Sequence, residues 1–270
     1  MLPLGLFFIG FFLAPLLVLV GVSLFGDPGF RTIGIEEYRR LFLDTFTFGV
    51  LLGTLWLGVK ATLVCLIFGY PLAWLCATGG SRLRRFLLFL VVLPILTSVV
   101  VRTFAWIVIL GRQGILNKAL AAAGIIDEPL RLLFSEVGVV MVLAQVQLPL
   151  MVLPLLTTLE RIDPNLADAS AALGAGRWRT FRRVTLPLSL PGVAAGCILV
   201  YAACVTAFIT QTLIGGARLL YMPLFIYQQA TGANDWPFAA ALSIVFMISV
   251  LLVVYLLNVI GRAKRAQVYA

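Results

Sequence analysis

Few side chains in this sequence are of the types that carry out chemistry, and those few are scattered. The chain has no histidine, which excludes a histidine base and metal sites built on histidine. Its four cysteines lie inside apolar runs and form no Cys-x-x-Cys pair, so we interpret them as small buried residues: Cys65, Cys76, Cys197 and Cys204. We therefore predict no catalytic residue, no metal site and no cofactor bound by this chain.

Ionisable and polar residues inside apolar runs are the remaining candidates. An ionisable side chain at bilayer depth is a functional candidate, because burying its charge in hydrocarbon is costly. Each candidate also has a structural role as an alternative. The two cations, Lys60 and Arg102, could snorkel toward head groups or bond to a loop carbonyl, and the other polar residues could form interhelical hydrogen bonds. The residues that we predict to line a solute pathway are Lys60, Arg102, Trp106, Gln145, Gln147, Tyr201, Thr206, Thr210 and Gln211.

A long polar segment, residues 160–190, has the pattern of two short helices. Asp163 is a good N-cap, Pro164 suits a first helical turn, and the alanine-rich run beyond them ends at Gly174. A second short helix is predicted over Arg177–Thr185, with Trp178, Phe181 and Val184 on one face. Such a pair can dock onto a protein partner or lie at the membrane surface, and its physical chemistry leaves both readings open.

The elements that must hold these residues are membrane-spanning helices. The chain is 62% hydrophobic and 11% charged, and its apolar residues gather in runs of about 20, the length that crosses a bilayer. The first run has no basic flank or cleavage-like end, so we interpret it as a helix and not a signal peptide. The six predicted spans are Leu4–Phe25, Phe48–Thr78, Phe86–Leu110, Val137–Leu159, Pro191–Ile214 and Pro237–Ile260.

The connecting segments are predicted to contain two further short helices, Glu36–Phe42 and Asn117–Ala123, and the chain ends in a tail, Gly261–Ala270. One set of connecting segments carries 11 Lys and Arg residues, and the other set carries 7. The more basic set contains residues 79–85, residues 160–190 and the tail. The positive-inside rule places this set in the cytoplasm, which puts both termini there as well.

The polar segment resembles the EAA motif of permeases in binding-protein-dependent ABC importers of type I. Asp168-Ala169-Ser170 stands at the Glu-Ala-Ala position, Gly174 follows at the motif's spacing, and Leu186-Pro187 closes it. Asp168 departs from Glu, and Ser170 departs from Ala. The resemblance implies that the segment is the coupling loop seated on an ATPase. The coupling residues that it implies are Asp168, Ala169, Ser170, Gly174, Arg177, Trp178, Phe181, Leu186 and Pro187.

The same resemblance implies partners: an ABC ATPase dimer, a second permease subunit, an extracytoplasmic substrate-binding protein and membrane lipid, with no nucleic acid. It implies an all-α permease domain over residues 1–270 in a bacterial inner membrane. No lysine follows a Gly-x-x-x-x-Gly frame, so ATP and Mg are expected to be used by the ATPase, and this chain is not predicted to be an enzyme.

The cargo is the least determined property. Residues 69–74, 94–102 and 148–151 are similar to the spermidine/putrescine permease family, which implies a polyamine carried by alternating access. No Asp or Glu lies within the core of a predicted span, however, so Lys60 and Arg102 favour an anionic or zwitterionic solute instead, such as a carboxylate, an amino acid or a phosphonate. Trp74, Trp106 and Tyr201 could meet a cation through their rings.

Two other classes remain as alternatives. A stand-alone secondary transporter would be expected to have intramembrane acids or an internal repeat. A membrane enzyme would need clustered catalytic groups near one face. The sequence shows none of these features.

Overall fold

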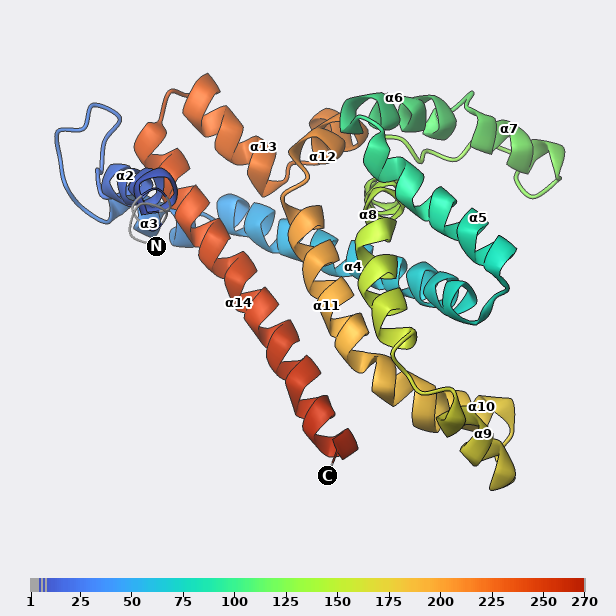
Figure 1. Ribbon diagram of the computed structural model, residues 1–270. Helices are drawn as coiled ribbons and strands as arrows, with labels where there is room; N and C mark the ends of the chain where they lie inside the picture. The colour runs from blue at the N-terminus through green and yellow to red at the C-terminus, as the bar shows by residue number, and fades with distance from the viewer. Residues whose placement is uncertain (1–4, 6, 8, 270) are drawn as a thin grey trace. The chain divides into compact units, whose positions relative to one another are not determined.

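The computed structural model describes residues 5, 7 and 9–269, and the side chains of 260 and 262–269 are not described. Regular structure in this part of the chain is helical, apart from one isolated bridge between Phe25 and Ile33. The α-helices (Figure 1) are α2 Ala14–Ser23, α3 Glu36–Leu43, α4 Thr45–Thr78, α5 Ser81–Val92, α6 Val99–Leu110, α7 Ile115–Ala122, α8 Glu136–Leu159, α9 Asn165–Ala172, α10 Arg177–Thr180, α11 Leu186–Val205, α12 Phe208–Gly215, α13 Met222–Tyr227 and α14 Trp236–Tyr269.

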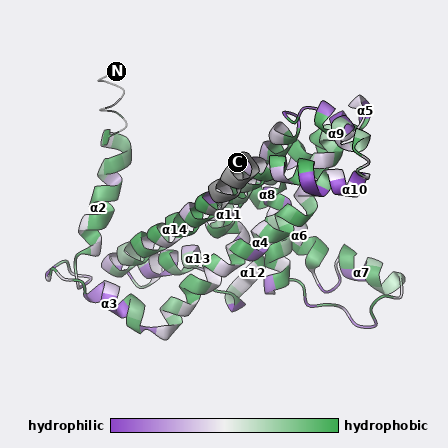
Figure 2. Cartoon of the chain, turned by 90° about the horizontal axis from the view of Figure 1, so that it is seen from below, coloured by the Kyte–Doolittle hydropathy of each residue, from purple (hydrophilic) through white to green (hydrophobic). Residues whose placement is uncertain are grey.

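Short turns of tighter or wider helix join several of these elements. The 3₁₀ turns are η2 Leu93–Leu96 and η4 Gly216–Arg218, and the π-helical turns are η1 Ile9–Leu13, η3 Phe181–Thr185 and η5 Gln228–Gly232. Within the described residues, five helices are long and apolar enough to cross a membrane, or six if the pair 208–218 and 222–232 forms one span. Figure 2 shows the contrast between apolar α8, α11 and α14 and the polar segment at α9 and α10. The all-α membrane fold is confirmed.

Most of the predicted helices are confirmed. α4, α8 and the two short helices α3 and α7 agree with the sequence patterns to within a few residues. The predicted first span begins at Leu4, which lies outside the described residues, and its described helix ends at Ser23. The helix of the last span continues to Tyr269 through the predicted tail, whose basic side chains lie outside the described part; Ala270 lies outside it too.

The third predicted span, Phe86–Leu110, is wrong as a continuous helix. α5 ends at Val92, a 3₁₀ turn follows, and Thr97 and Ser98 are extended before α6 starts at Val99. Pro94 is the physical reason, because it has no N–H for the preceding turn and disfavours helix in the residue before it. The guanidinium of Arg102 donates from Nη1 to the carbonyl of Pro94 at 2.5 Å.

The fifth predicted span, Pro191–Ile214, is wrong at both ends. Its helix runs without interruption from Arg177 to Val205, through the π-helical turn at Phe181–Thr185. That wider turn comes just before Pro187, where a regular helix would lack a hydrogen bond. At the other end the chain breaks at Thr206 and Ala207, and α12 follows as a separate helix. The predicted loop over residues 215–236 also contains a helix, α13.

The chain forms two compact units, residues 1–55 with 220–251, and residues 56–219 with 252–270. In the second unit α8 and α11 lie side by side (Figure 1). The side chain of Met151 in α8 lies close to two glycines. A Cβ added at Gly69 of α4 would lie 2.8 Å from Cγ of Met151, and a Cβ added at Gly196 of α11 would lie 2.7 Å from its Sδ. Glycines at these two positions therefore let three helices approach closely around one side chain.

In the first unit the core includes Leu41 of α3, Phe225 of α13 and Phe238 of α14. The rings of Phe225 and Phe238 meet edge to face, with centroids 6.3 Å apart. The amide of Met222 donates to the hydroxyl of Thr54 at 2.8 Å, which fixes the first turn of α13 to α4.

Candidate functional site

The first of the two predicted short helices is present as α9. The second, predicted over Arg177–Thr185, is wrong as a separate helix, because α10 continues without interruption into α11. The carboxylate of Asp163 accepts the amide of Asn165 at 2.9 Å at the start of α9. Gly174 ends that turn with a φ of +76°, and its amide donates to the carbonyl of Ala171 at 2.9 Å. A left-handed residue at this position is typical of a glycine that terminates a helix.

The two short helices are joined by side chains. The hydroxyl oxygens of Ser170 on α9 and Thr180 on α10 lie 2.9 Å apart. Ser170 is one of the two positions that depart from the motif, so the departure adds a hydrogen bond where alanine would have none. Asp168, the other departure, is exposed and forms no ion pair among the described residues.

An aromatic cluster connects this segment to the transmembrane helices. Phe181 stacks on Trp178 with centroids 5.5 Å apart, and it meets Tyr70 and Trp74 of α4 edge to face at 5.9 and 6.4 Å. The hydroxyl of Tyr70 lies 2.9 Å from that of Ser189, which is buried in α11. Movement of the segment would therefore be passed to α4 by ring contacts, and along the uninterrupted helix to α11.

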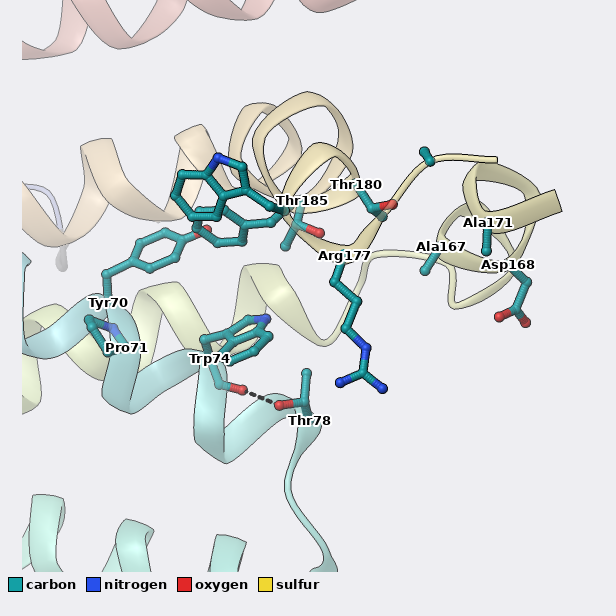
Figure 3. A pocket seen from close by; sticks show the side chains of 13 residues that line it. Tyr70, Pro71, Trp74, Thr78, Ala167, Asp168, Ala171, Arg177, Thr180 and Thr185 are labelled. Carbon is teal, nitrogen blue, oxygen red and sulfur yellow. Dashed lines mark hydrogen bonds between the residues drawn. The ribbon is translucent and has the colours of Figure 1, made fainter. Parts of the chain in front are cut away.

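The four rings of this cluster form part of the lining of a groove of about 780 Å³ (Figure 3). The groove lies between the end of α4 and the two short helices, and the side chain of Arg177 extends into it. Its lining residues are Tyr70, Pro71, Trp74, Thr78, Ala167, Asp168, Ala171, Ala175, Arg177, Trp178, Thr180, Phe181 and Thr185. The structure thus brings five of the predicted coupling residues near one another: Asp168, Ser170, Arg177, Trp178 and Phe181.

The outer surface of the segment exposes apolar side chains. Leu173 is 88% exposed and Trp178 is 72% exposed, and the small residues Ala169 and Gly174 are exposed as well. Leu186 and Pro187 instead lie half-buried in the first turn of α11. Arg84 of α5 forms an ion pair with Glu160, which ties the basic turn before α5 to the start of the segment.

The predicted pathway residues are not gathered into one site. The indole of Trp106 donates to Gln145 at 3.1 Å, and this is the hydrogen bond that joins two members of the set in the described chain. Gln147 is half-buried in α8, Thr210 is buried, and Thr206 is exposed with its hydroxyl bonded to Ala202.

Two more of the predicted pathway residues have structural contacts. One lies where two helices approach closely, and the other lies where a helix ends. Tyr201 is buried against α4, where a Cβ added at Gly58 would lie 2.8 Å from its ring. Gln211 donates from Nε2 to the carbonyls of Cys204 and Val205 at 2.7 and 3.2 Å, so it satisfies the end of α11. Arg102 likewise donates to the carbonyl of Pro94. Two of the predicted pathway residues, Arg102 and Gln211, therefore stabilise places where a helix is interrupted.

Lys60 has a partner that the sequence analysis assigned to a loop. Its Nζ lies 2.6 Å from Oε1 of Glu136, the first residue of α8. Glu136 lies at the end of the span and not in its core, so the prediction of a core without carboxylates stands, but the prediction did not foresee this carboxylate as the partner of Lys60. Ser135 in the sequence indicates where α8 starts. Its hydroxyl accepts the amide of Gly138 at 3.1 Å, as an N-cap does, and this puts Glu136 in the first turn of the helix.

A second charged group lies in the first compact unit, outside the spans. Arg40 donates to Asp235 at 2.9 Å and to Glu37 at 3.3 Å, and its guanidinium lies 4.0 Å from the ring centroid of Phe238. Burial raises the pKa of Glu37 above its ordinary value, and the nearby charge of Asp235 raises it further. Hydrogen bonding to Arg40 opposes both effects.

Comparison with known proteins places this geometry in a family. Residues 69–265 match the family described as "Binding-protein-dependent transport system inner membrane component". The spermidine/putrescine transport system permease protein PotB of Escherichia coli K12 is 38% identical over 251 residues, which cover 91% of each chain. PotB of Haemophilus influenzae is 36% identical over 249 residues, which cover 91% of this chain and 87% of the relative.

A solved structure has the same fold. The chain matches a bacterial alginate ABC transporter, solved in complex with an alginate pentasaccharide-bound periplasmic protein, with a TM-score of 0.80. The match covers 98% of this chain and 93% of that one at 20% identity. The chain therefore belongs to the family of inner membrane components of binding-protein-dependent transport systems.

Proposed function

We propose that this inner-membrane permease subunit imports a polyamine, such as spermidine or putrescine, in an ATP-driven transporter that works by alternating access. The observation that carries the proposal is the 38% identity to PotB, which extends over 91% of both chains. Identity at this level across all the spans supports a shared cargo class more strongly than a matching motif does.

The coupling loop, residues 160–190, is proposed to dock onto a separate ATPase subunit. Its exposed Leu173 and Trp178 supply an apolar surface next to small residues, which suits insertion into a cleft. Behind that surface Phe181 contacts Tyr70 and Trp74, so a displacement of the loop has a direct route into α4. ATP and Mg are used by the ATPase in this scheme.

The remaining partners follow from the same class of transporter. A second permease subunit completes the pathway, and a periplasmic substrate-binding protein delivers the cargo. The excess of Lys and Arg on the segments that include the coupling loop supports a cytoplasmic location for that loop and for both termini.

The charge arrangement supports a cationic cargo over the anionic alternative. The case for an anion rested on Lys60 and Arg102 as uncompensated cations. Lys60 is paired with Glu136, and Arg102 is bonded to a backbone carbonyl. The charge of Lys60 is therefore compensated by a carboxylate at the edge of α8, whereas Arg102 has a carbonyl as its hydrogen-bond acceptor and no ion pair in the described chain.

Two measurements test the proposal. Calorimetry of the cognate binding protein should show retention of spermidine or putrescine and no binding of a carboxylate or phosphonate. The tagged permease should co-purify with an ATPase whose hydrolysis is stimulated by the loaded binding protein. Retention of an anion would replace the cargo, whereas purification without any ATPase would overturn the importer mechanism.

A further inference from the structure

Lys60, Glu136 and Trp56 form a small group of a chemistry that fits one kind of ligand. Trp56 and Lys60 are four residues apart on α4, so they share a face of the helix. The ammonium of Lys60 lies 2.6 Å from the carboxylate of Glu136 and 5.7 Å from the ring centroid of Trp56. A carboxylate beside an aromatic ring is a combination that binds alkylammonium groups.

Stability does not account for this group. A lysine within an apolar 34-residue helix is costly to insert into a membrane. The side chains of Lys60 and Glu136 are 35% and 45% exposed, and exposed ion pairs contribute at most about 1 kcal/mol. Trp56 is 56% exposed, so it is not needed to fill the core. All three side chains therefore lie at the surface of this subunit and outside its packed core.

The lysine side chain is itself a primary ammonium on four methylene groups. Putrescine is four methylene groups with a primary ammonium at each end, so Lys60 presents to Glu136 and Trp56 the same group that the proposed cargo would present. An intramolecular ligand of matching chemistry can be displaced by the cargo at little net electrostatic cost, because one ammonium replaces another.

We propose that Glu136 and Trp56 form a binding site for a primary ammonium group of the cargo, and that Lys60 occupies this site until the cargo displaces it. The inference rests on the proposed polyamine cargo and adds to it a site and a role for each residue. Lys60 then keeps other small cations from Glu136, and the Lys60 ammonium is released when a polyamine binds.

The test uses the assembled transporter in proteoliposomes with saturating, putrescine-loaded binding protein and labelled putrescine. Glu136→Gln should lower uptake about fivefold, the factor that corresponds to one exposed charge pair. Lys60→Gln should raise uptake, because it removes the competitor and keeps the carboxylate. The double variant should be as slow as Glu136→Gln alone. Trp56→Leu should also lower uptake, while Trp56→Phe should retain it.

A purely structural ion pair predicts a different pattern. Both single variants would then lose uptake through an unpaired charge, and the double variant would recover it. That pattern, or equal uptake by Glu136→Gln and the wild type, would overturn the inference. The matched control is Glu128→Gln, which removes an exposed acid from the segment that precedes α8, and immunoblotting confirms equal amounts in the membrane.

The two proposals fail in distinguishable ways. If the wild-type transporter with loaded binding protein moves no polyamine, the cargo assignment fails and this site fails with it. If the wild type moves putrescine and the Glu136 and Trp56 variants match it, the cargo assignment stands and the ammonium site alone is wrong.

Discussion

At the residue scale, Gly174 shows how one backbone conformation shapes the coupling loop. Its φ of +76° lies in the left-handed region, and a Cβ added there would meet no atom within 4 Å. A substitution is therefore penalised by backbone strain of about 1–2 kcal/mol and not by a clash. A penalty of this size can redirect the loop after α9 without unfolding the subunit.

Gly174→Leu is expected to abolish uptake while the subunit remains in the membrane. Gly176→Leu is the matched control, since Gly176 has an ordinary φ of −68° and equally open space around its Cβ position. Uptake and membrane content are measured in the same cells. Normal uptake by Gly174→Leu would contradict the coupling role of the loop.

Glu37 is a second residue whose surroundings have a measurable consequence. Its pKa is raised from the ordinary 4.5 by burial and then by Asp235, so the folded protein binds this proton more tightly than the unfolded chain does. Stability from this proton is present below pH 4.5 and is lost as the pH rises through the higher folded pKa.

We expect Glu37→Gln to remove this part of the pH dependence and to raise the melting temperature at neutral pH relative to the wild type. Melting is followed in detergent from the acid range to neutral pH. Glu36→Gln is the control, because the neighbouring Glu36 is exposed. An unchanged pH profile in Glu37→Gln would show that the raised pKa does not affect folding.

At the element scale, helix ends in this chain are set by side chains from elsewhere in the sequence. The end of α11 has neither Pro nor Gly at Thr206 and Ala207. Gln211 donates to the carbonyls of Cys204 and Val205, and the carbonyl of Cys204 also accepts the amide of Ala207 at 3.4 Å. The break is therefore stabilised by a buried amide one turn into the next helix.

Gln211→Met should destabilise the subunit by about 1–3 kcal/mol, because it removes the amide donor from the carbonyl of Val205 and leaves the carbonyl of Cys204 with only the long bond from the amide of Ala207. The loss is measured as a lower melting temperature in detergent. Thr206→Val, which removes an exposed hydroxyl bond at the same break, should change the melting temperature much less. Equal effects of the two variants would argue against Gln211 as the stabilising group.

The contact between the coupling loop and α4 depends on one ring. Phe181 meets three aromatic side chains, and each such pair contributes about 0.5–1.5 kcal/mol beyond its buried area. Phe181→Leu keeps an apolar side chain but removes these ring contacts, so it should weaken coupling more than folding.

Phe181→Leu is expected to lower uptake several-fold while ATP hydrolysis by the assembled complex continues. Uptake and hydrolysis are compared in proteoliposomes, with Val184→Ala as the control on the same π-helical turn. If the ratio of uptake to hydrolysis stays at the wild-type value, Phe181 does not transmit the movement.

At the scale of the whole molecule, the distribution of charge predicts the orientation in the membrane. Segments with 11 Lys and Arg residues alternate along the chain with segments that have 7. The free cysteines are buried, except for half-buried Cys197, so introduced cysteines can be labelled against a low background.

Ala175→Cys in the coupling loop should react with a membrane-impermeant maleimide only in inverted vesicles, and Ala123→Cys only in intact cells. Both positions are outside the predicted spans, and the parent chain without an added cysteine gives the background. Labelling of Ala175→Cys from outside intact cells would invert the topology and remove the basis for contact with an ATPase.

The sequence by itself determined the features that depend on neighbouring residues. Apolar runs long enough to cross a bilayer, the proline- and glycine-bounded coupling helices, and the spacing from Asp168 to Pro187 are all local, so they could be read along the chain. The family was recognisable from this spacing for the same reason. α4, α8 and the first short helix of the loop, α9, followed those patterns.

The break in the third predicted span follows from Pro94, which the sequence shows, but tertiary structure decided how the fifth span ends and what each intramembrane charge meets. Lys60 and Glu136 are 76 positions apart, and no periodicity along the chain relates them. The carbonyls at the end of α11 are satisfied by Gln211 only once α12 folds back onto them. Hydrogen bonds and ion pairs between distant residues form only after the helices pack, and they therefore settle the sites that local pattern leaves open.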